Sequence, residues 1–91
     1  MRTAEDARLS AICRALADPT RRSLLRRLLA EPGVTTGELA AGTASLTRFA
    51  VMKHLGVLRD AGLVRTMSQG RRRRHFGEPE ALAPLRAWLA G

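Results

Sequence analysis

The sequence predicts a mainly α-helical chain that carries one small β-hairpin, and three observations lead to this prediction. Apolar residues recur at intervals of three and four positions through most of the chain, which is the period of amphipathic helices. Threonine, aspartate, proline and glycine stand where these stretches begin and end. Over residues 63–76 the pattern changes to β-forming residues around a Gln-Gly turn. The length fits one domain, over residues 1–91, with a single modest core.

The chain is strongly basic, with 16 Lys and Arg against 8 Asp and Glu and a formal net charge of +8. This charge favours a polyanionic partner over a small acidic substrate, although solubility alone also accounts for a basic surface. No stretch is long and apolar enough for a membrane span, and the amino terminus lacks a secretion signal. We therefore expect a cytoplasmic protein with no membrane partner. The lone Cys13 cannot form an intramolecular disulfide, which fits a reducing compartment.

Two amphipathic helices are predicted at the start of the chain. The first, over residues 3–17, has an apolar stripe formed by Leu9, Ile12, Cys13 and Leu16. Asp18 followed by Pro19 ends it and starts the next helix, because proline disfavours helix for the residue before it and suits the first helical position after an aspartate cap. The second, over residues 19–30, has paired leucines on one side and arginines on the other.

The next two predicted helices are joined by a short turn. Thr35 and Glu38 have the spacing of a capping box, which starts a short helix over residues 35–42. The longer helix runs over residues 47–61, between a threonine cap and Gly62, and buries Val51, Leu55 and Leu58 on one face. Two helices separated by about four residues make a helix-turn-helix candidate, whose second helix would enter a DNA major groove.

A hairpin and a last helix complete the chain. Residues 63–68 form the outgoing strand, Gln69 and Gly70 the turn, and residues 71–76 the returning strand, with arginines at the tip. A disordered basic tail is the alternative, but β-forming residues flank the arginines and a helix follows them. The last helix begins at Glu78 and Pro79, with a stripe formed by Leu82, Leu85, Trp88 and Leu89.

In this order the elements have the layout of a winged helix-turn-helix, and the sequence resembles the ArsR-type family of bacterial transcriptional repressors. Residues 15–22, 51–64 and 70–76 carry the resemblance. It is closest to the branch that does not sense metals, whose recognition helix begins Leu-Thr-Arg-Phe-Ala-Val-Met-Lys-His-Leu, as residues 46–55 do here. The resemblance implies a homodimeric repressor on an inverted-repeat operator, with recognition helices in successive major grooves.

By the same resemblance, the dimer contact is expected from the first and last helices. The residues themselves agree, because these outer helices carry more apolar surface than so small a monomer needs. The alternative is that these side chains close the core of a single chain, and for Trp88 both interpretations are equally supported. The expected dimer residues are Leu9, Ile12, Leu85, Trp88 and Leu89.

The predicted base-reading residues lie at the amino end of the 47–61 helix. Arg48 is the first candidate, because its guanidinium can pair with guanine O6 and N7 or brace a phosphate. Thr47 can cap the helix and also meet a phosphate. Phe49 and Met52 suit a thymine methyl or packing against the 35–42 helix equally well.

The predicted backbone contacts are basic. Lys53 suits a phosphate because its ammonium group is flexible, whereas His54 lies at the edge of the buried face and fits a packed histidine somewhat better than a DNA contact. The hairpin arginines suit affinity more than sequence choice, since alternate side chains of a strand point oppositely. They are Arg71, Arg72, Arg73 and Arg74, with the first two favoured.

Catalytic, metal and cofactor sites are not predicted. Residues 36–41 have no Cys or His, and residues 78–91 have glutamates without a histidine, so the metal ligands of many relatives are missing. Cys13 is expected to be a small core residue, with a redox role as the alternative because Arg14 adjoins it. The acidic residues have the positions of caps and surface groups, which argues against an enzyme.

A sequence-indifferent basic protein, architectural on DNA or associated with RNA, is the alternative function. The chain has only three aromatic residues, so few side chains are available to stack on the bases of single-stranded nucleic acid. The capped and presented helix instead favours double-stranded DNA. A small-molecule or protein effector stays open and unidentified.

Overall fold

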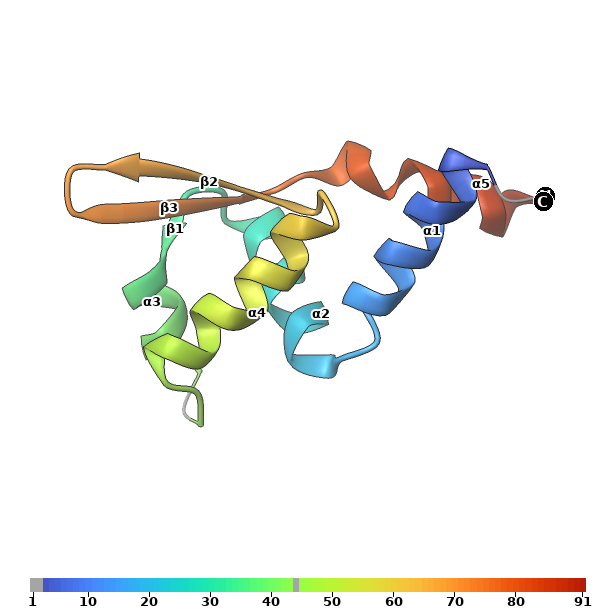
Figure 1. Cartoon of the computed structure of the whole chain (residues 1–91). Helices are drawn as coiled ribbons and strands as arrows, with labels where there is room; N and C mark the ends of the chain where they lie inside the picture. Colours follow the sequence, from blue (N-terminus) through green and yellow to red (C-terminus); the bar gives the residue numbers. More distant parts are fainter. Residues whose placement is uncertain (1–2, 44) are drawn as a thin grey trace.

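The computed structural model describes residues 3–43 and 45–91, so Ala44, in the connection between the two helix-turn-helix helices, lies outside the described residues. The molecule is elongated, with extents of 44 × 26 × 21 Å. In Figure 1 a long hairpin projects at one end, and α1 and α5 lie side by side at the other. The elements are α1 (Ala4–Ala15), α2 (Pro19–Ala30), β1 (Val34–Thr35), α3 (Thr36–Ala41), α4 (Arg48–Asp60), β2 (Val64–Gln69), β3 (Arg72–Gly77), the 3₁₀ helix η1 (Pro79–Leu82) and α5 (Ala83–Ala90).

Side-chain caps fix the helix starts as predicted. The Asp18 carboxylate accepts hydrogen bonds from the backbone N–H groups of Thr20 and Arg21, at 2.7 and 3.1 Å. Thr35 and Glu38 form the expected capping box at the start of α3. Thr47 Oγ1 accepts a hydrogen bond from the backbone N–H of Ala50 at 3.1 Å, so Thr47 is the cap and α4 begins at the next residue, Arg48. These caps satisfy backbone donors that have no partner within the helix.

The hairpin is confirmed, but it belongs to a three-stranded antiparallel sheet with the order β1-β3-β2. The extra strand, β1, has only two residues, and it pairs Val34 with His75 and Thr35 with Arg74. A strand this short leaves no periodic pattern in the sequence, which is why it was not predicted. The last helical segment also differs from the prediction, because it starts as the 3₁₀ helix η1 and becomes α-helical only at Ala83.

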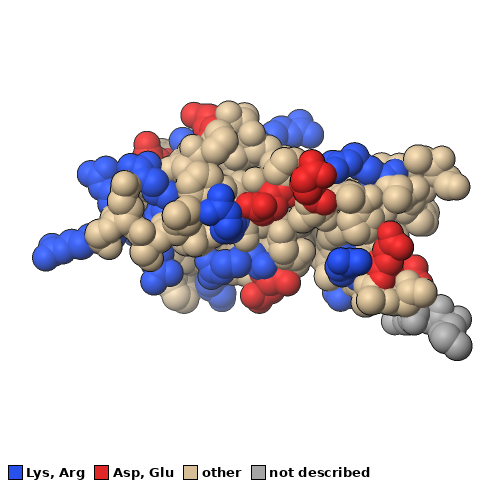
Figure 2. All heavy atoms as spheres, turned by 90° about the horizontal axis from the view of Figure 1, so that it is seen from above, with Lys and Arg blue, Asp and Glu red and all other residues tan. Residues whose placement is uncertain are grey.

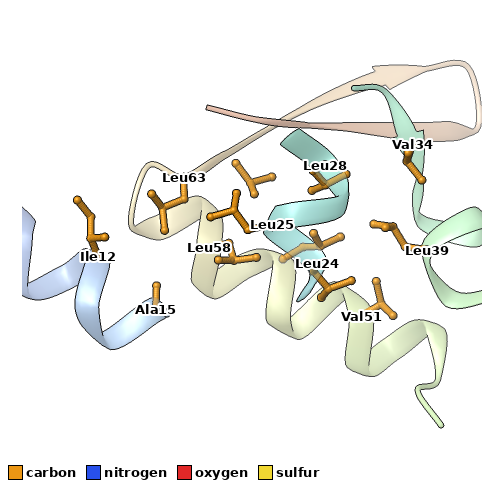
Figure 3. Close-up of a cluster of buried hydrophobic side chains, with 12 residues drawn as sticks. Ile12, Ala15, Leu24, Leu25, Leu28, Val34, Leu39, Val51, Leu58 and Leu63 are labelled. Atoms are coloured by element: carbon orange, nitrogen blue, oxygen red, sulfur yellow. The ribbon is translucent and has the colours of Figure 1, made fainter. Parts of the chain in front are cut away.

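The core lies between α2 and α4 and extends under the sheet (Figure 3). Val51, Leu55 and Leu58 form the buried face of α4, as predicted. Leucines of α2 face them, and Leu39 of α3 and Leu63 before β2 close the ends. Because α4 is held along one whole side, its opposite side is presented to solvent in a fixed orientation.

Two expectations about α1 are corrected. Ile12 is 2% exposed and packs in the core of its own chain, so it is not available at a surface between two chains. Cys13 is exposed, and is not the core residue expected. The physical reason is helix geometry: Ile12, Ala15 and Leu16 share the inward face, and each residue turns the helix by about 100°, which carries Cys13 off that face.

Candidate nucleic-acid interface

The presented side of α4 carries apolar and basic side chains together. Phe49 is 70% exposed and Met52 47% exposed, and Arg48 and Lys53 are exposed as well. Exposure of this size does not support the interpretation that Phe49 and Met52 pack against α3. Large apolar side chains held in water beside cations are typical of a surface that meets a partner.

Two contacts organise the amino end of α4. The Arg48 guanidinium lies over Gly37 of α3, where a methyl group on the glycine would come within 3.8 Å of Nη2. Lys53 Nζ lies 5.6 Å from the centroid of the Phe49 ring, a cation–π distance. Lys53 and Phe49 therefore lie together, and Arg48 adjoins Phe49 at the amino end of the helix.

His54 is half-buried in α4, which packs against α2, and Asp18 caps the start of α2. Hydrogen bonding from the backbone N–H of Arg21 is the main cause that lowers the pKa of Asp18, and the charges of Arg21 and His54 add to it. This placement supports the packed interpretation of His54 over a phosphate contact.

The four arginines of the hairpin do not share one environment. Arg71, Arg72 and Arg73 are exposed. Arg74 is half-buried: its Nε donates to Gln69 Oε1 at 2.5 Å and its Nη1 donates to the Gly33 carbonyl at 3.0 Å. Because two of its N–H donors are used within the chain, Arg74 has the surroundings of a structural residue, unlike the backbone contact expected of it.

Positive charge gathers at the hairpin end of the molecule. Figure 2 shows a cluster of Lys and Arg over the end where Figure 1 places the tip of β2 and β3, and further Lys and Arg interspersed with Asp and Glu along the rest of this face. A field of this kind attracts a polyanion to the hairpin and to the face of α4 beside it.

His75 is a residue of this region that the sequence analysis did not single out. It lies in β3, is 2% exposed, and has both ring nitrogens within hydrogen-bond distance of threonine hydroxyls: Nε2 to Thr36 Oγ1 at 2.7 Å, and Nδ1 to Thr66 Oγ1 at 2.9 Å. Burial, together with the charges of Arg59 and Arg73, lowers the pKa of His75. The available signal was the strand period of two, which turns His75 to the face opposite Arg72 and Arg74.

The end of the molecule opposite the hairpin is apolar. Trp88 and Leu89 of α5 are 67% and 69% exposed, Leu85 is half-buried against the core, and Leu9 is half-buried in α1, which contacts α5. The exposure of Trp88 argues against the interpretation that it closes the core of its own chain.

The described residues contain neither a metal-binding cluster nor a helix that could span a membrane. No group of three or more His, Cys, Asp or Glu among residues 3–43 and 45–91 is arranged to hold a metal ion. Within the same ranges, no helix combines the length and the apolar character that crossing a bilayer requires.

A short helix, a turn, and a capped helix with a presented basic face, flanked by a sheet whose hairpin carries arginines, define a winged helix-turn-helix protein. Comparisons of sequence agree with this class. A family profile described as a helix-turn-helix domain matches residues 16–66. The chain is 39% identical over 85 residues to the uncharacterized HTH-type transcriptional regulator YuzN of Bacillus subtilis (strain 168), covering 87% of this chain and 92% of that one. It is 44% identical over 75 residues to the HTH-type transcriptional regulator Rv2034 of Mycobacterium tuberculosis (strain ATCC 25618 / H37Rv), covering 82% and 68%.

Comparisons of structure name the family. A crystal structure of an ArsR family transcriptional regulator matches with a TM-score of 0.85 and 41% identity, over 99% of this chain and 90% of that one. An ArsR-like transcriptional regulator from Rhodococcus sp. RHA1 matches with a TM-score of 0.84 and 29% identity, over 99% and 81%. The chain therefore belongs to the ArsR-type winged helix-turn-helix family of DNA-binding transcriptional regulators, which are not enzymes.

Proposed function

We propose that the chain acts in the cytoplasm as a homodimeric repressor on an inverted-repeat operator. The observation that carries this proposal is the presented face of α4, where Arg48, Phe49, Met52 and Lys53 are exposed on a helix whose other side is locked in the core. A recognition helix of this kind lies in the major groove with its amino end toward the bases.

Each residue of that face suits a defined role. Arg48 can donate two N–H groups to guanine O6 and N7, and Phe49 and Met52 can contact thymine methyl groups. Thr47 and Lys53 lie beside them and can hold phosphates on either side of the reading helix. The exposed hairpin arginines, Arg71 to Arg73, add phosphate contacts on the flanking duplex.

The second copy is proposed to meet the chain through α1 and α5. Trp88 and Leu89 together expose two of the largest apolar side chains of the protein, and Leu9 and Leu85 continue this surface toward the core. An isologous contact would bury them and set two α4 helices about one DNA turn apart. Ile12 is left out of this surface, because it packs within its own chain.

The dimer is tested by sedimentation equilibrium of the wild type and of the double variant Trp88→Ala, Leu89→Ala. We expect a dimer for the wild type and a monomer for the variant, because full burial of each side chain contributes about 1.5 to 3 kcal/mol. Met67→Ala is the control, since Met67 is 51% exposed on β2, away from this surface. A monomeric wild type, or a variant that still dimerises, contradicts the proposal.

The operator is tested by genomic footprinting with the purified protein. We expect symmetric sites with half-sites about 10 base pairs apart, upstream of genes whose reporter output falls when the protein is present. Equal affinity for genomic and random duplexes would instead support an architectural protein, and preference for RNA would support an RNA-associated one.

A further inference from the structure

Four polar side chains from four different elements form one continuous chain of hydrogen bonds beneath the sheet. Arg59, in the last turn of α4, donates from Nη1 to Thr66 Oγ1 of β2 at 3.1 Å. Thr66 Oγ1 lies 2.9 Å from His75 Nδ1 in β3, and His75 Nε2 lies 2.7 Å from Thr36 Oγ1, in the first turn of α3. His75 links the hairpin directly to α3, and through Thr66 it is connected to Arg59 of α4.

The donors and acceptors of this chain are consistent with a neutral imidazole. A neutral ring has one N–H donor and one acceptor nitrogen. Because Arg59 already donates to Thr66 Oγ1, the Thr66 hydroxyl hydrogen can turn to Nδ1, and the Nε2 hydrogen then points to Thr36 Oγ1. No buried side-chain nitrogen or oxygen of the described residues is left without a partner, so this set is complete.

The surroundings oppose a proton on the ring. Burial of the ring is the main cause that lowers the pKa of His75 below 6.5, and Arg59 of α4 and Arg73 of β3 add repulsion. The acid on α3, Glu38, is engaged by the backbone N–H and hydroxyl of Thr35. Arg74 points to the other face of the sheet, where it is bonded to Gln69 and Gly33.

The backbone alone leaves the angle between the hairpin and the helices weakly defined. β2 and β3 pair from Val64 to Gln69, but β1 covers β3 only at His75 and Arg74, so the outer half of the hairpin is a free two-stranded ribbon. An isolated ribbon of this kind is marginal without lateral support. His75 lies at the inner end of that ribbon. A small rotation of the hairpin at this point would move its tip further than the same rotation nearer the tip.

We propose that His75 is a positioning residue for DNA binding: through Thr66 and Thr36 it fixes the hairpin against α3 and α4, so that the hairpin arginines and α4 reach one duplex together. This inference rests on the proposed role of the hairpin as a phosphate-binding wing. Loss of the link weakens the wing contacts while the amino end of α4 keeps its own shape.

The first test removes one hydroxyl at a time. Thr36→Val and Thr66→Val keep the branched shape. Thr36→Val deletes the hydrogen bond to His75 Nε2, whereas Thr66→Val deletes both the bond to His75 Nδ1 and the one from Arg59. We expect duplex affinity to fall about threefold to tenfold in each variant. The salt dependence of binding should become shallower in both, because fewer phosphates are engaged. Thr20→Val is the control, since no hydrogen bond of the Thr20 hydroxyl is present among the described residues. Fluorescence anisotropy at several salt concentrations, well below each melting temperature, measures both quantities.

The second test uses a readout that a purely structural role would not move. Affinity of the wild type for DNA should fall between about pH 7.5 and pH 5, because a protonated ring cannot accept from Thr66 and lies beside two guanidinium groups. His75→Gln retains a polar group near Nε2 but does not titrate, so its affinity should be lower at pH 7.5 and should follow a flatter pH profile. His54 is present in both proteins, so the comparison isolates the effect of residue 75.

The outcomes separate this inference from the proposed function. Valine variants that bind as the wild type does, with the same salt slope, overturn it, as do identical pH profiles for the wild type and His75→Gln. If His75→Gln does not fold, Thr66→Val measured at both pH values decides the question, with a flatter profile expected. If the wild type shows no sequence preference, the proposed operator function is wrong. The His75 inference can still be tested in that case, with random duplex as the ligand.

Discussion

At the scale of single residues, Arg48 has the geometry that a base contact needs. Its side chain is exposed, it follows the Thr47 cap directly, and its guanidinium is held over Gly37 rather than by a carboxylate. A planar group that keeps its donors can pair with guanine without first breaking an ion pair. This placement separates Arg48 from the arginines of α2 and β3 that are bonded within the chain.

Arg48→Ala should reduce the preference for the operator over random duplex by about tenfold to a hundredfold, since one bidentate base contact contributes about 1 to 3 kcal/mol of discrimination. The melting temperature should not change, because the residue is exposed and makes no side-chain hydrogen bond to the described residues. Titrations of both duplexes measure the ratio. An unchanged ratio would remove Arg48 from base reading.

His75 shows why single residues of the site escaped prediction. Its role depends on Thr36 and Thr66, which are 39 and 9 positions away in sequence, and on burial that only the assembled sheet creates. Arg74 shows the same limit in reverse, because its charge suggested DNA while Gly33 and Gln69 take up its donors. Local patterns predict which face of an element a residue lies on, but not which residues distant in sequence contact it there.

At the scale of elements, we propose that the hairpin and α4 have different roles in DNA binding. The arginines exposed near the tip of the hairpin are proposed to contact phosphates, which are the same in every sequence. The double variant Arg71→Ala, Arg72→Ala should therefore weaken operator and random duplex alike. In a dimer the salt slope should become shallower by about 3 to 4, because four arginines are removed. Arg48→Ala is the matched comparison, and an equal loss of sequence preference in both variants contradicts this division.

Neighbouring residues of α1 offer a test of the corrected inward face. Ile12→Ala should lower the free energy of unfolding by about 2 to 5 kcal/mol, because the side chain is 2% exposed and its removal leaves a cavity. Cys13→Ala should stay within about 0.5 kcal/mol of the wild type, since the thiol is exposed. Denaturant unfolding measures both. If the two variants lost similar amounts of unfolding free energy, Cys13 would belong to the buried face of α1, as the sequence predicted.

Most elements were predictable because local chemistry marks their ends. Asp18, the Thr35–Glu38 capping box and Thr47 start helices through side-chain hydrogen bonds to nearby backbone N–H groups. Gly62 follows the end of α4 with a φ of +78°, which favours glycine. The unpredicted pieces, β1 and η1, depend on neighbours instead. β1 exists only because β3 lies beside it, and its two residues have no pattern of their own.

At the scale of the whole molecule, stability should decline in acid in two stages. His75 acts first: its folded pKa lies below 6.5, so as the pH falls through 6.5 the unfolded chain gains a proton that the folded chain resists, and the free energy of unfolding falls. Backbone hydrogen bonds lower the pKa values of Asp18 and Glu38, so their contribution is present above the unfolded values of 3.8 and 4.5 and is lost below them.

Denaturant unfolding at about pH 7.5, 5.5 and 3 should resolve the two stages. His75→Gln should remove much of the decline between the first two values and leave the decline between the last two. Asp18→Asn is the matched variant for the lower stage. It should leave the decline between about pH 7.5 and 5.5 and reduce the decline between about pH 5.5 and 3. A wild type whose stability is flat from about pH 7.5 to 5.5 would show that the folded ring accepts its proton as readily as the unfolded one.

Thr35 closes β1 and at the same time caps α3, so one residue is both the edge of the sheet and the start of the helix-turn-helix. If β1 separated from β3, the first turn of α3 would lose its cap, because no residue separates β1 from α3. The sheet and the amino end of α3 are therefore mechanically coupled. Native-state hydrogen exchange should therefore release the amides of β1 and of the first turn of α3 in a single opening event, and DNA should slow both to the same degree.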